Sequence, residues 1–385
     1  MMPVRILFSH CAIFASLFVV CDCLTRSTEA AAELQIYGDR SGFSLDAFRT
    51  PVDPRDGTEI LAQSGSDSHW WVTIAVGTPP QPIPVVVDSG TVDLSLMSTF
   101  INQAQRGYAP VYDPNRSSTA VMLDGYTWYQ NYAGAPAPNM GYVVQDTVRV
   151  GSIYTTNFTF EIDNVTAIPH ITGPPYGNLG LDLDPNGQPT SPKKVPGWLQ
   201  TVMKFLKQPV FAIDYRRNNF KGVIDFGYID SKKYNGSIAY APINQQTLWA
   251  ISIDGVGIGS GAYRHAPFDV IFDTGGDGLV FPRWAIDAYF AQVPNSTWDA
   301  GLNTYTFPCD QSVLGKLPNI TFGIGDSYRG VIPSDHIHLG LLHDNVCFNS
   351  LRAGDRPFWG TSIIASQFMV FDYGGKRLGF AHKNL

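Results

Sequence analysis

The sequence predicts an all-β protein built from two related lobes. Its 385 residues can form two hydrophobic cores, because a single core rarely grows beyond about 250–300 residues. Charged residues make up 15% of the chain and aromatic residues 13%, a composition that excludes disordered and coiled-coil proteins. Short alternating strands and a motif that occurs once in each half predict the two-lobed arrangement.

Composition also narrows the range of partners. Acidic residues outnumber basic ones by 33 to 26, which gives a formal net charge of −7. A negative surface repels phosphate groups, so nucleic acids and anionic membranes are not expected as partners. The 37 glycines and 27 prolines show no collagen-like period and indicate a compact chain with many turns.

The first 30 residues are expected to be a signal peptide. Arg5 precedes an apolar stretch, residues 6–20, which has the order of a secretory signal and is short for a membrane span. Cleavage could follow Cys23 or Ala30, and a retained signal anchor is the alternative. We therefore expect a secreted, extracellular protein, or a vacuolar one, with no membrane segment after signal removal.

Residues 31–66 are polar and weakly patterned, so they are expected to be a short leader or propeptide rather than part of the core. The alternative is that they stay and form the first strand of the N-terminal lobe. That lobe is placed at residues 67–235, and the C-terminal lobe at residues 236–385.

Only Cys309 and Cys347 lie outside the expected signal peptide. Two thiols in an oxidising compartment are expected to form one disulfide, which would stabilise the fold by roughly 4 kcal/mol in the chain-entropy model. Glycosylation is expected at some of six Asn-x-Ser/Thr sequences. These begin at Asn115, Asn157, Asn164, Asn235, Asn295 and Asn319.

Apolar runs predict short strands, and turn residues such as those of Gly77–Pro80 separate them. The predicted strands are Trp70–Val76, Ile83–Val87, Tyr142–Val150, Phe158–Ile162, Gly222–Phe226 and Leu248–Ile253. Helices are predicted at Pro196–Lys207 and Pro282–Gln292, each opening with the proline that a first helical turn tolerates.

An internal repeat carries the candidate chemistry. Asp88-Ser89-Gly90 and Asp273-Thr274-Gly275 each follow an apolar strand, and the two aspartates are 185 residues apart. Each is followed about 90 residues later by a glycine in an apolar context, Gly180 and Gly360. One such tripeptide is an ordinary turn, but two at matching places in two half-chains indicate a duplicated lobe.

Two such loops facing each other would bring Asp88 and Asp273 within hydrogen-bonding distance. Like charges that close cannot both ionise, so the pair would share one proton at acid pH. One carboxylate could then act as general base on a water while its protonated partner polarises a carbonyl. This chemistry needs neither a metal nor a cofactor, and none is expected.

These residues resemble the pepsin-like aspartic endopeptidases, and among them the secreted fungal, penicillopepsin-type members. The resemblance runs from about Trp70 to Lys383 and rests first on the two Asp motifs. Further matching stretches are Val76–Gln81, Val223–Asp230, Tyr234–Ile238, Phe368–Tyr373 and Arg377–Ala381.

The resemblance implies a bilobal fold with pseudo-twofold related lobes and a central cleft for an extended peptide or protein substrate. It assigns catalysis to the two motif aspartates and places Gly90, Thr91 and Gly275 beside the substrate. Tyr132 best matches the tyrosine of the hairpin flap, with Tyr126 and Tyr129 as alternatives. It also implies that the two remaining cysteines form the disulfide of the C-terminal lobe, and that the protein is a monomer.

The chain departs from this family pattern at several positions. The family bonds the outer oxygen of each aspartate with a Ser or Thr; Thr91 would supply this for the first, whereas Gly276 cannot for the second. Ser95 replaces a tryptophan, and Thr361 replaces an aspartate. The alternative function is therefore a catalytically weakened, pepsin-like protein that binds peptides.

Two further departures concern the flap. Ala133 stands where a glycine normally follows the flap tyrosine, and Gly134 stands where some fungal relatives carry an aspartate that favours lysine substrates.

Activation is expected to follow the zymogens of this family, in which a basic leader side chain sits between the catalytic carboxylates. The candidates here are Arg40, Arg49 and Arg55, with Arg26 if the signal ends early. No dibasic pair lies between the signal and Trp70, so self-cleavage at low pH is expected.

Three other sequence features are expected to be structural rather than functional. Gly257–Ala262 has the spacing of a dinucleotide fingerprint but no helix pattern, so a hairpin turn is expected. Three histidines, His336, His338 and His343, lack a ligand cluster and are expected to be solvated. Asp93 and Asp277 are expected to be turn or surface residues.

Overall fold

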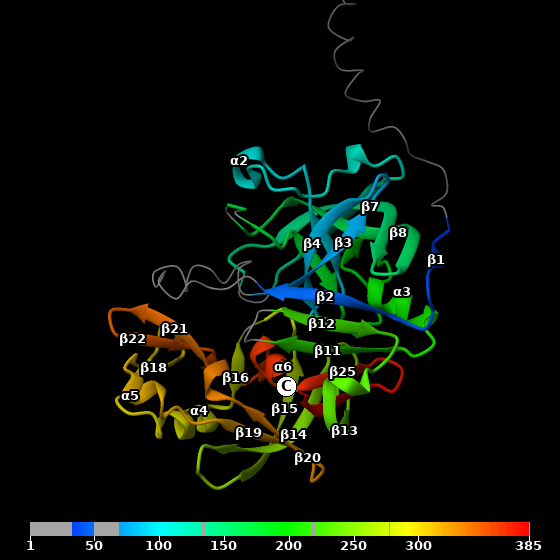
Figure 1. Ribbon diagram of the computed structural model, residues 1–385. Coiled ribbons are helices and arrows are strands. Elements are labelled where there is room, and N and C mark those ends of the chain that lie inside the picture. Colours follow the sequence, from blue (N-terminus) through cyan, green and yellow to red (C-terminus); the bar gives the residue numbers. More distant parts are fainter. Residues whose placement is uncertain are drawn as a thin grey trace, which may run out of the picture.

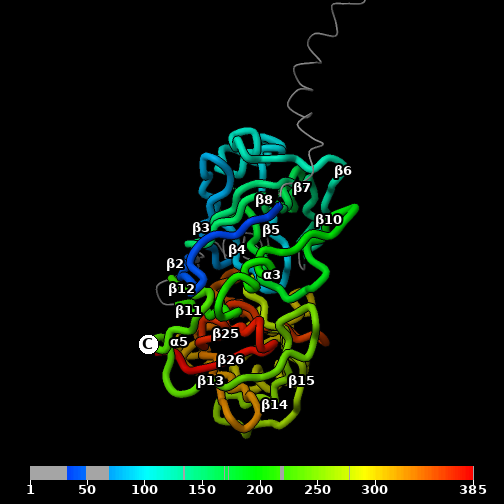
Figure 2. Tube along the Cα trace, turned by 90° about the vertical axis from the view of Figure 1, so that its right-hand side faces the viewer, coloured from blue at the N-terminus to red at the C-terminus, as the bar shows by residue number. Residues whose placement is uncertain are grey.

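The computed structural model describes residues 33–49, 69–132, 135–168, 170–171, 173–216, 221–276 and 278–384. In these ranges strands dominate and form two lobes (Figure 1). The side view shows the lobe with β3–β8 above the lobe with β13–β15, and β2, β11 and β12 between them (Figure 2). The expected all-β, two-lobed fold is confirmed.

The strands of the N-terminal lobe are β3 (Trp70–Val76), β4 (Gln81–Asp88), β5 (Leu94–Met97), β6 (Val121–Gln130), β7 (Asn139–Val150), β8 (Ile153–Val165), β9 (Gly177–Gly180) and β10 (Thr190–Ser191). The same 15-stranded sheet continues through β1 (Gln35–Tyr37), β2 (Phe43–Arg49), β11 (Val210–Arg216), β12 (Lys221–Phe226), β13 (Tyr234–Pro242), β25 (Phe368–Asp372) and β26 (Arg377–Lys383).

A seven-stranded sheet of the C-terminal lobe holds β14 (Ala250–Ile258), β15 (Arg264–Phe272), β16 (Leu279–Phe281), β19 (Ile320–Ile324), β20 (Tyr328–Ile332), β23 (Leu351–Ala353) and β24 (Phe358–Trp359). A four-stranded sheet holds β17 (Thr297–Asp299), β18 (Thr304–Pro308), β21 (His338–His343) and β22 (Val346–Asn349).

The helices are short. They are α2 (Gln103–Arg106), α3 (Trp198–Phe205), α4 (Arg283–Phe290), α5 (Gln311–Leu314) and α6 (Thr361–Ser366), with single 3-10 turns at η2 (Pro114–Arg116), η3 (Ser231–Lys233) and η4 (Ser334–His336). The two predicted helices are confirmed as α3 and α4. In the described part of the chain, none of the helices has the length and apolar character that a membrane crossing requires.

The internal repeat is visible in the strand pairing. In the first lobe β4 runs parallel to β9, β9 antiparallel to β5, and β5 parallel to β8. In the second lobe β15, β24, β16 and β23 repeat the same sequence of directions. Asp88 thus pairs with Gly180, and the amide of Asp273 donates to the carbonyl oxygen of Trp359, directly before Gly360. The predicted duplication is confirmed.

Strand β2 lies in the middle of the large sheet. It pairs with β12 along its length and with β3 at its end, and Phe43, Leu45 and Ala47 are buried. The weak pattern of residues 31–66 predicted a leader outside the core, whereas this part of it packs into the core. Removal of the segment stays a prediction, and it would leave β3 and β12 without the strand between them.

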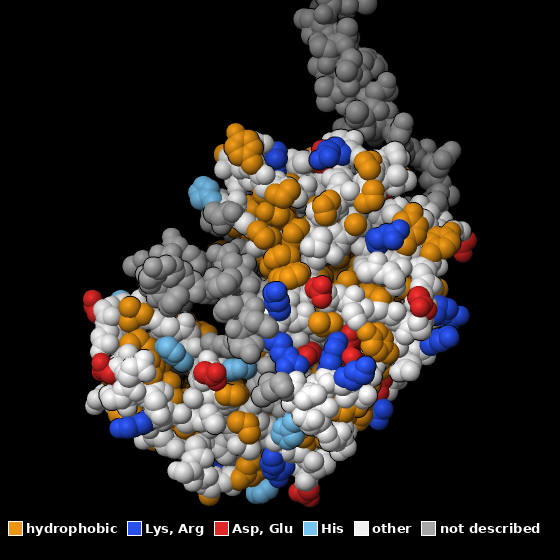
Figure 3. Space-filling model, in the orientation of Figure 1, with side chains coloured by type: hydrophobic (Ala, Val, Ile, Leu, Met, Phe, Trp, Pro, Cys, Tyr) orange, Lys and Arg blue, Asp and Glu red, His pale blue; other side chains and the backbone are white. Residues whose placement is uncertain are grey.

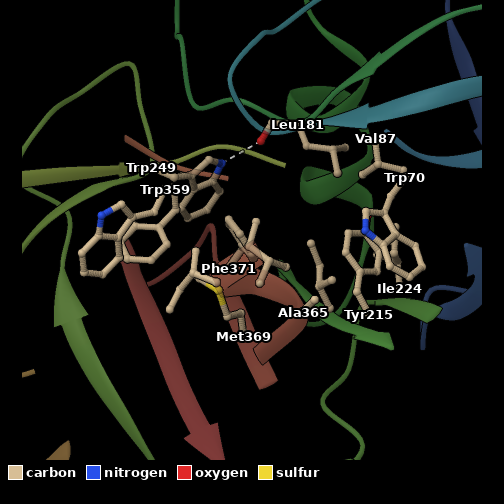
Figure 4. Packing of buried hydrophobic residues seen from close by; sticks show 14 of the residues in the cluster. Trp70, Val87, Leu181, Tyr215, Ile224, Trp249, Trp359, Ala365, Met369 and Phe371 are labelled. Atoms are coloured by element: carbon tan, nitrogen blue, oxygen red, sulfur yellow. Dashed lines mark hydrogen bonds between the residues drawn. The ribbon is translucent and has the colours of Figure 1, made fainter. Parts of the chain in front are cut away.

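Buried hydrophobic side chains from both lobes, several of them aromatic, pack into one cluster (Figure 4). Trp70 stacks on Tyr215 with ring centroids 4.1 Å apart. The indole Nε1 of Trp249, just before β14, donates to the carbonyl oxygen of Leu181 at 2.7 Å. Because Leu181 follows β9, this buried bond ties the C-terminal lobe to the segment beside Asp88.

The surface shows no separation of charge by sign on the face in Figure 3, where basic and acidic side chains of the described residues are interspersed. Apolar side chains gather on the upper lobe of the same view. The disulfide between Cys309 and Cys347 is present, with an S–S distance of 2.02 Å, and links the end of β18 to β22.

Candidate active site

The two motif aspartates lie against each other across the two lobes. Asp88 ends β4, and Asp273 directly follows β15. A Cβ atom on Gly90 would lie 2.7 Å from the Asp273 carboxylate, and one on Gly275 would lie 2.5 Å from the Asp88 carboxylate. Any larger residue would push the opposite carboxylate away, which explains the glycine in each motif.

Each aspartate is held by its own turn. The amide of Gly90 donates to Oδ1 of Asp88 at 2.8 Å, and the amide of Gly275 donates to Oδ1 of Asp273 at 2.8 Å. The equal distances reflect the pseudo-twofold relation of the two loops. One oxygen of each carboxyl group is thereby fixed by its own backbone.

The middle residues of the motifs join the loops. The Ser89 amide donates to Oγ1 of Thr274 at 2.8 Å, and the Thr274 amide donates to Oγ of Ser89 at 3.0 Å. The Thr274 hydroxyl donates to the carbonyl oxygen of Val87, and the Ser89 hydroxyl to that of Phe272. Both hydroxyl groups are fully buried, so these four bonds fix the position of one loop relative to the other.

Burial raises the pKa of the carboxyl groups of both Asp88 and Asp273. The charge of Asp273 raises the pKa of Asp88 further, to well above its usual range. The pKa of Asp273 rises less, because hydrogen bonds from the Gly275 amide and from Asp88 stabilise its ionised form. Such a pair holds one shared proton through the acid range and releases it only at a higher pH than an isolated aspartate would.

Tyr132 is the candidate flap tyrosine that contacts the segment following the first motif. Its hydroxyl donates to Oδ2 of Asp93 at 3.1 Å and lies 3.2 Å from Oγ of Ser95. Tyr126 and Tyr129, the alternatives for the flap, both lie within β6, and Tyr129 is more than half exposed. Contact of Tyr132 with a substrate stays a prediction.

Asp93 is buried, so the expectation of a surface position was wrong for this side chain. The backbone alone resembles a turn, but the hairpin that carries Tyr132 covers the side chain. Burial raises the pKa of Asp93 to about 6, against the opposing effect of its hydrogen bonds to Thr91 and Tyr132. Asp277 lies outside the described residues.

The two departures beside the aspartates have structural consequences. Oγ1 of Thr91 accepts a bond from the amide of Asp93 at 3.4 Å, instead of bonding Asp88 as expected. At Gly276, a Cβ atom would lie 2.8 Å from the ring of Phe358. The space for a hydroxyl-bearing side chain at this position is therefore taken by Phe358. The Thr361 amide donates to the carbonyl oxygen of Gly276 at 2.7 Å.

Arg40 does not occupy the region of the paired aspartates. Its guanidinium donates to the carbonyl oxygen of Phe205 at 2.8 Å and stacks on the ring of that residue. Arg26, Arg55 and the side chain of Arg49 lie outside the described residues. The expectation that Arg40 reaches between the carboxylates is thus wrong for this arrangement.

The weaker motifs fall in ordinary places. Gly257–Ala262 spans the end of β14 and the hairpin turn that leads to β15, as expected. His338 was expected to be solvated, but its Nε2 lies 3.0 Å from Sγ of Cys347. Because that sulfur is in the disulfide, it offers no thiolate for a metal.

The six candidate glycosylation sites are accessible. Four are exposed, Asn115, Asn235, Asn295 and Asn319, and Asn157 and Asn164 are partly exposed. Modification of these side chains stays a prediction.

Two acidic residues near the paired motifs were not found from the sequence. Glu161 and Asp163, both in β8, are buried at 0% and 2% exposure. No local signal marked them, because residues 158–163 alternate between apolar and polar side chains, a pattern that predicts a solvent-exposed face for both carboxylates.

Comparisons with known proteins give the same protein family, and each covers most of the chain. The model of the eukaryotic aspartyl protease family matches residues 69–383, from just before β3 to the end of β26. Endothiapepsin of Cryphonectria parasitica is 30% identical over 370 residues, which cover 94% of this chain and 82% of the relative. Penicillopepsin-3 of Penicillium janthinellum is 30% identical over 331 residues, covering 84% and 81%. Aspergillopepsin-1 of Aspergillus fumigatus is 30% identical over 346 residues, covering 85% and 83%.

Proposed function

The chain belongs to the eukaryotic aspartyl protease family and is a pepsin-like aspartic protease, and we propose that it is a secreted endopeptidase that cleaves proteins at acid pH. Asp88 and Asp273 are the catalytic residues of this proposal. The supporting observation is that each motif glycine leaves room only for the carboxylate of the opposite lobe. The substrates are peptides or proteins, as the family implies.

In the proposed mechanism a water molecule is held between the two carboxyl groups, which share one proton. The ionised carboxylate takes a proton from this water as the water attacks the peptide carbonyl carbon. The protonated carboxyl donates to the carbonyl oxygen, and a proton then passes to the leaving amine. The cross-lobe bonds of Ser89 and Thr274 keep both groups in place without reorganisation.

The substrate lies extended in the cleft between the lobes in this proposal. Gly90 and Gly275 lie beside the substrate, and Tyr132 covers it from the flap hairpin of β6 and β7. Thr91 contributes through Asp93 rather than through Asp88.

The proposed activity is tested by cleavage of an acid-denatured protein between pH 2.5 and 7.5. We expect an acid optimum and inhibition by a statine-type mimic of the tetrahedral state, with no effect of a metal chelator. A neutral optimum, or loss of activity with the chelator, would contradict the two-aspartate mechanism. Binding of the statine mimic without any cleavage would favour the weakened, peptide-binding alternative, for which the occupied space at Gly276 is the specific reason.

We propose export through a signal peptide at residues 1–30, to the extracellular space or the vacuole, as a glycosylated monomer. The disulfide and the exposure of the Asn-x-Ser/Thr sites support this compartment. Deglycosylation of the exported protein should lower its apparent mass.

We propose that residues 31–66 are a leader that the enzyme removes from itself at low pH. N-terminal sequencing of the exported protein before and after acid treatment tests this. An unchanged start near Ala31 in fully active enzyme would refute the activation step and leave the catalytic proposal intact.

A further inference from the structure

A row of paired residues leads from the catalytic strand to Glu161. Val86 lies two residues before Asp88 and therefore on the same face of the sheet. The register pairs Val86 with Asn178, Asn178 with Ser95, and Ser95 with Glu161. Paired residues of neighbouring strands point to the same side. Glu161 thus lies on the same face of the sheet as Asp88.

Glu161 is buried and lacks a hydrogen-bond partner among the described residues. Its side chain is 0% exposed, and neither carboxylate oxygen accepts a bond from that part of the chain. One oxygen of Asp163 and one of Asp93 are also buried without a partner. Their other oxygens accept bonds from Asn139 and Tyr132. A buried carboxyl group without a partner costs folding free energy, so the absence of a donor needs a functional explanation.

The second lobe carries the opposite charge at the matching place. The equivalent row in that lobe is Ile271, Phe358, Val280 and Arg352, joined by the same sequence of strand pairings. The counterpart of Glu161 is therefore Arg352. Its Nη1 donates to two backbone carbonyl oxygens, and its guanidinium lies over the ring of Phe348. The matching positions in the two lobes thus carry side chains of opposite charge.

We propose that Glu161, together with Asp93 and Asp163, forms a subsite for a lysine or arginine side chain of the substrate. The inference rests on the proposed function. The cationic group replaces the Tyr132 hydroxyl as donor to Asp93 and supplies the donors that Glu161 lacks. Because Arg352 occupies the matching place in the other lobe, the preference for a basic side chain holds on one side of the scissile bond only.

The distance agrees with a position close to the scissile bond. Three inter-strand spacings of about 4.8 Å separate β4 from β8, or about 14 Å in total. A lysine side chain reaches about 6 Å, and an extended peptide advances about 3.3 Å per residue. The basic residue therefore lies within about three residues of the bond that is cleaved.

The charge of the subsite gives the preference a definite pH dependence. Burial, and then the charge of Asp93, raise the pKa of both Glu161 and Asp163. Lys194 is the cation that lowers the pKa of Asp93 and Glu161, and the acidic Asp184 raises that of Asp93. Because the carboxylates ionise as pH rises, selectivity for a cation should increase with pH across the active range.

The test compares peptides that carry lysine or norleucine, an uncharged side chain of similar length, at each of three positions on either side of the scissile bond. We expect lysine to raise kcat/KM at least tenfold at one position on one side, with a larger ratio at pH 5.5 than at pH 3.5. In Glu161→Gln the ratio should fall to within threefold of one.

Asp344→Asn is the charge control, since this side chain is 96% exposed in the C-terminal lobe, and it should keep the lysine preference. Retention of the preference in Glu161→Gln would overturn the inference. A parent enzyme that cleaves the norleucine and lysine peptides equally well would also overturn the inference. This comparison does not depend on the folding of a variant, and it would leave the proposed function standing. Failure to cleave any peptide would overturn both.

Discussion

Asp93→Asn should reduce the loss of stability that this protein suffers as pH rises. The folded-state pKa of Asp93 is raised from 3.8 to about 6 by burial. Between these values the folded protein binds more protons than the unfolded chain, so the free energy of unfolding falls with pH. A shift of about two units corresponds to roughly 3 kcal/mol, lost between about pH 4 and pH 7. Asparagine keeps the shape and cannot titrate, so it removes this share of the pH dependence.

Urea unfolding at pH 4 and pH 7, followed by tryptophan fluorescence, measures the effect. The difference in unfolding free energy between the two pH values should be smaller in Asp93→Asn than in the parent by roughly 3 kcal/mol. Asp344→Asn, which removes an exposed carboxylate, should leave the difference unchanged. Equal losses in the parent and in Asp93→Asn would refute the assignment of a raised pKa to Asp93.

Two further substitutions test the motif loops. Thr274→Val removes the hydroxyl that accepts from the Ser89 amide and leaves a buried donor unpaired. The free energy of unfolding should fall by roughly 2–4 kcal/mol, and kcat should fall with it. Unchanged values would mean that other contacts hold the two loops together. Gly276→Thr should lower both stability and kcat, because the ring of Phe358 lies 2.8 Å from the new Cβ. The double variant with Phe358→Leu should recover stability, and a single variant that is already as stable as the parent would contradict the clash.

Local sequence patterns were enough to predict most of the fold. Alternation predicted Trp70–Val76 as a strand, and it is β3 with the same ends. The repeated Asp motifs predicted the duplicated lobe, because the matching apolar strands before them were visible in the sequence. The central position of β2 was not predictable from composition, since its partners β12 and β3 lie far along the chain and sheet pairing is not a local property.

The candidate catalytic residues could be predicted from the sequence because they belong to a repeated motif. The contacts that surround them could not, because these depend on tertiary packing. Asp88 and Asp273 were predicted from the repeated motif. Asp93 was expected in a turn or on the surface, because Tyr132, which bonds its buried side chain, is 39 residues away in the sequence. The block at Gly276 depends on the ring of Phe358, brought beside it by strand pairing.

The most direct test of the catalytic proposal is the rate of peptide cleavage by Asp88→Asn and Asp273→Asn at the acid optimum. Each substitution keeps the side-chain volume and removes one titrating oxygen from the pair, so each rate should fall below about 1% of the parent. Circular dichroism should show both variants folded, because the bonds between Ser89 and Thr274 remain. A folded variant that kept more than about a tenth of the parent rate would contradict a mechanism in which both carboxyl groups act on the water and the carbonyl.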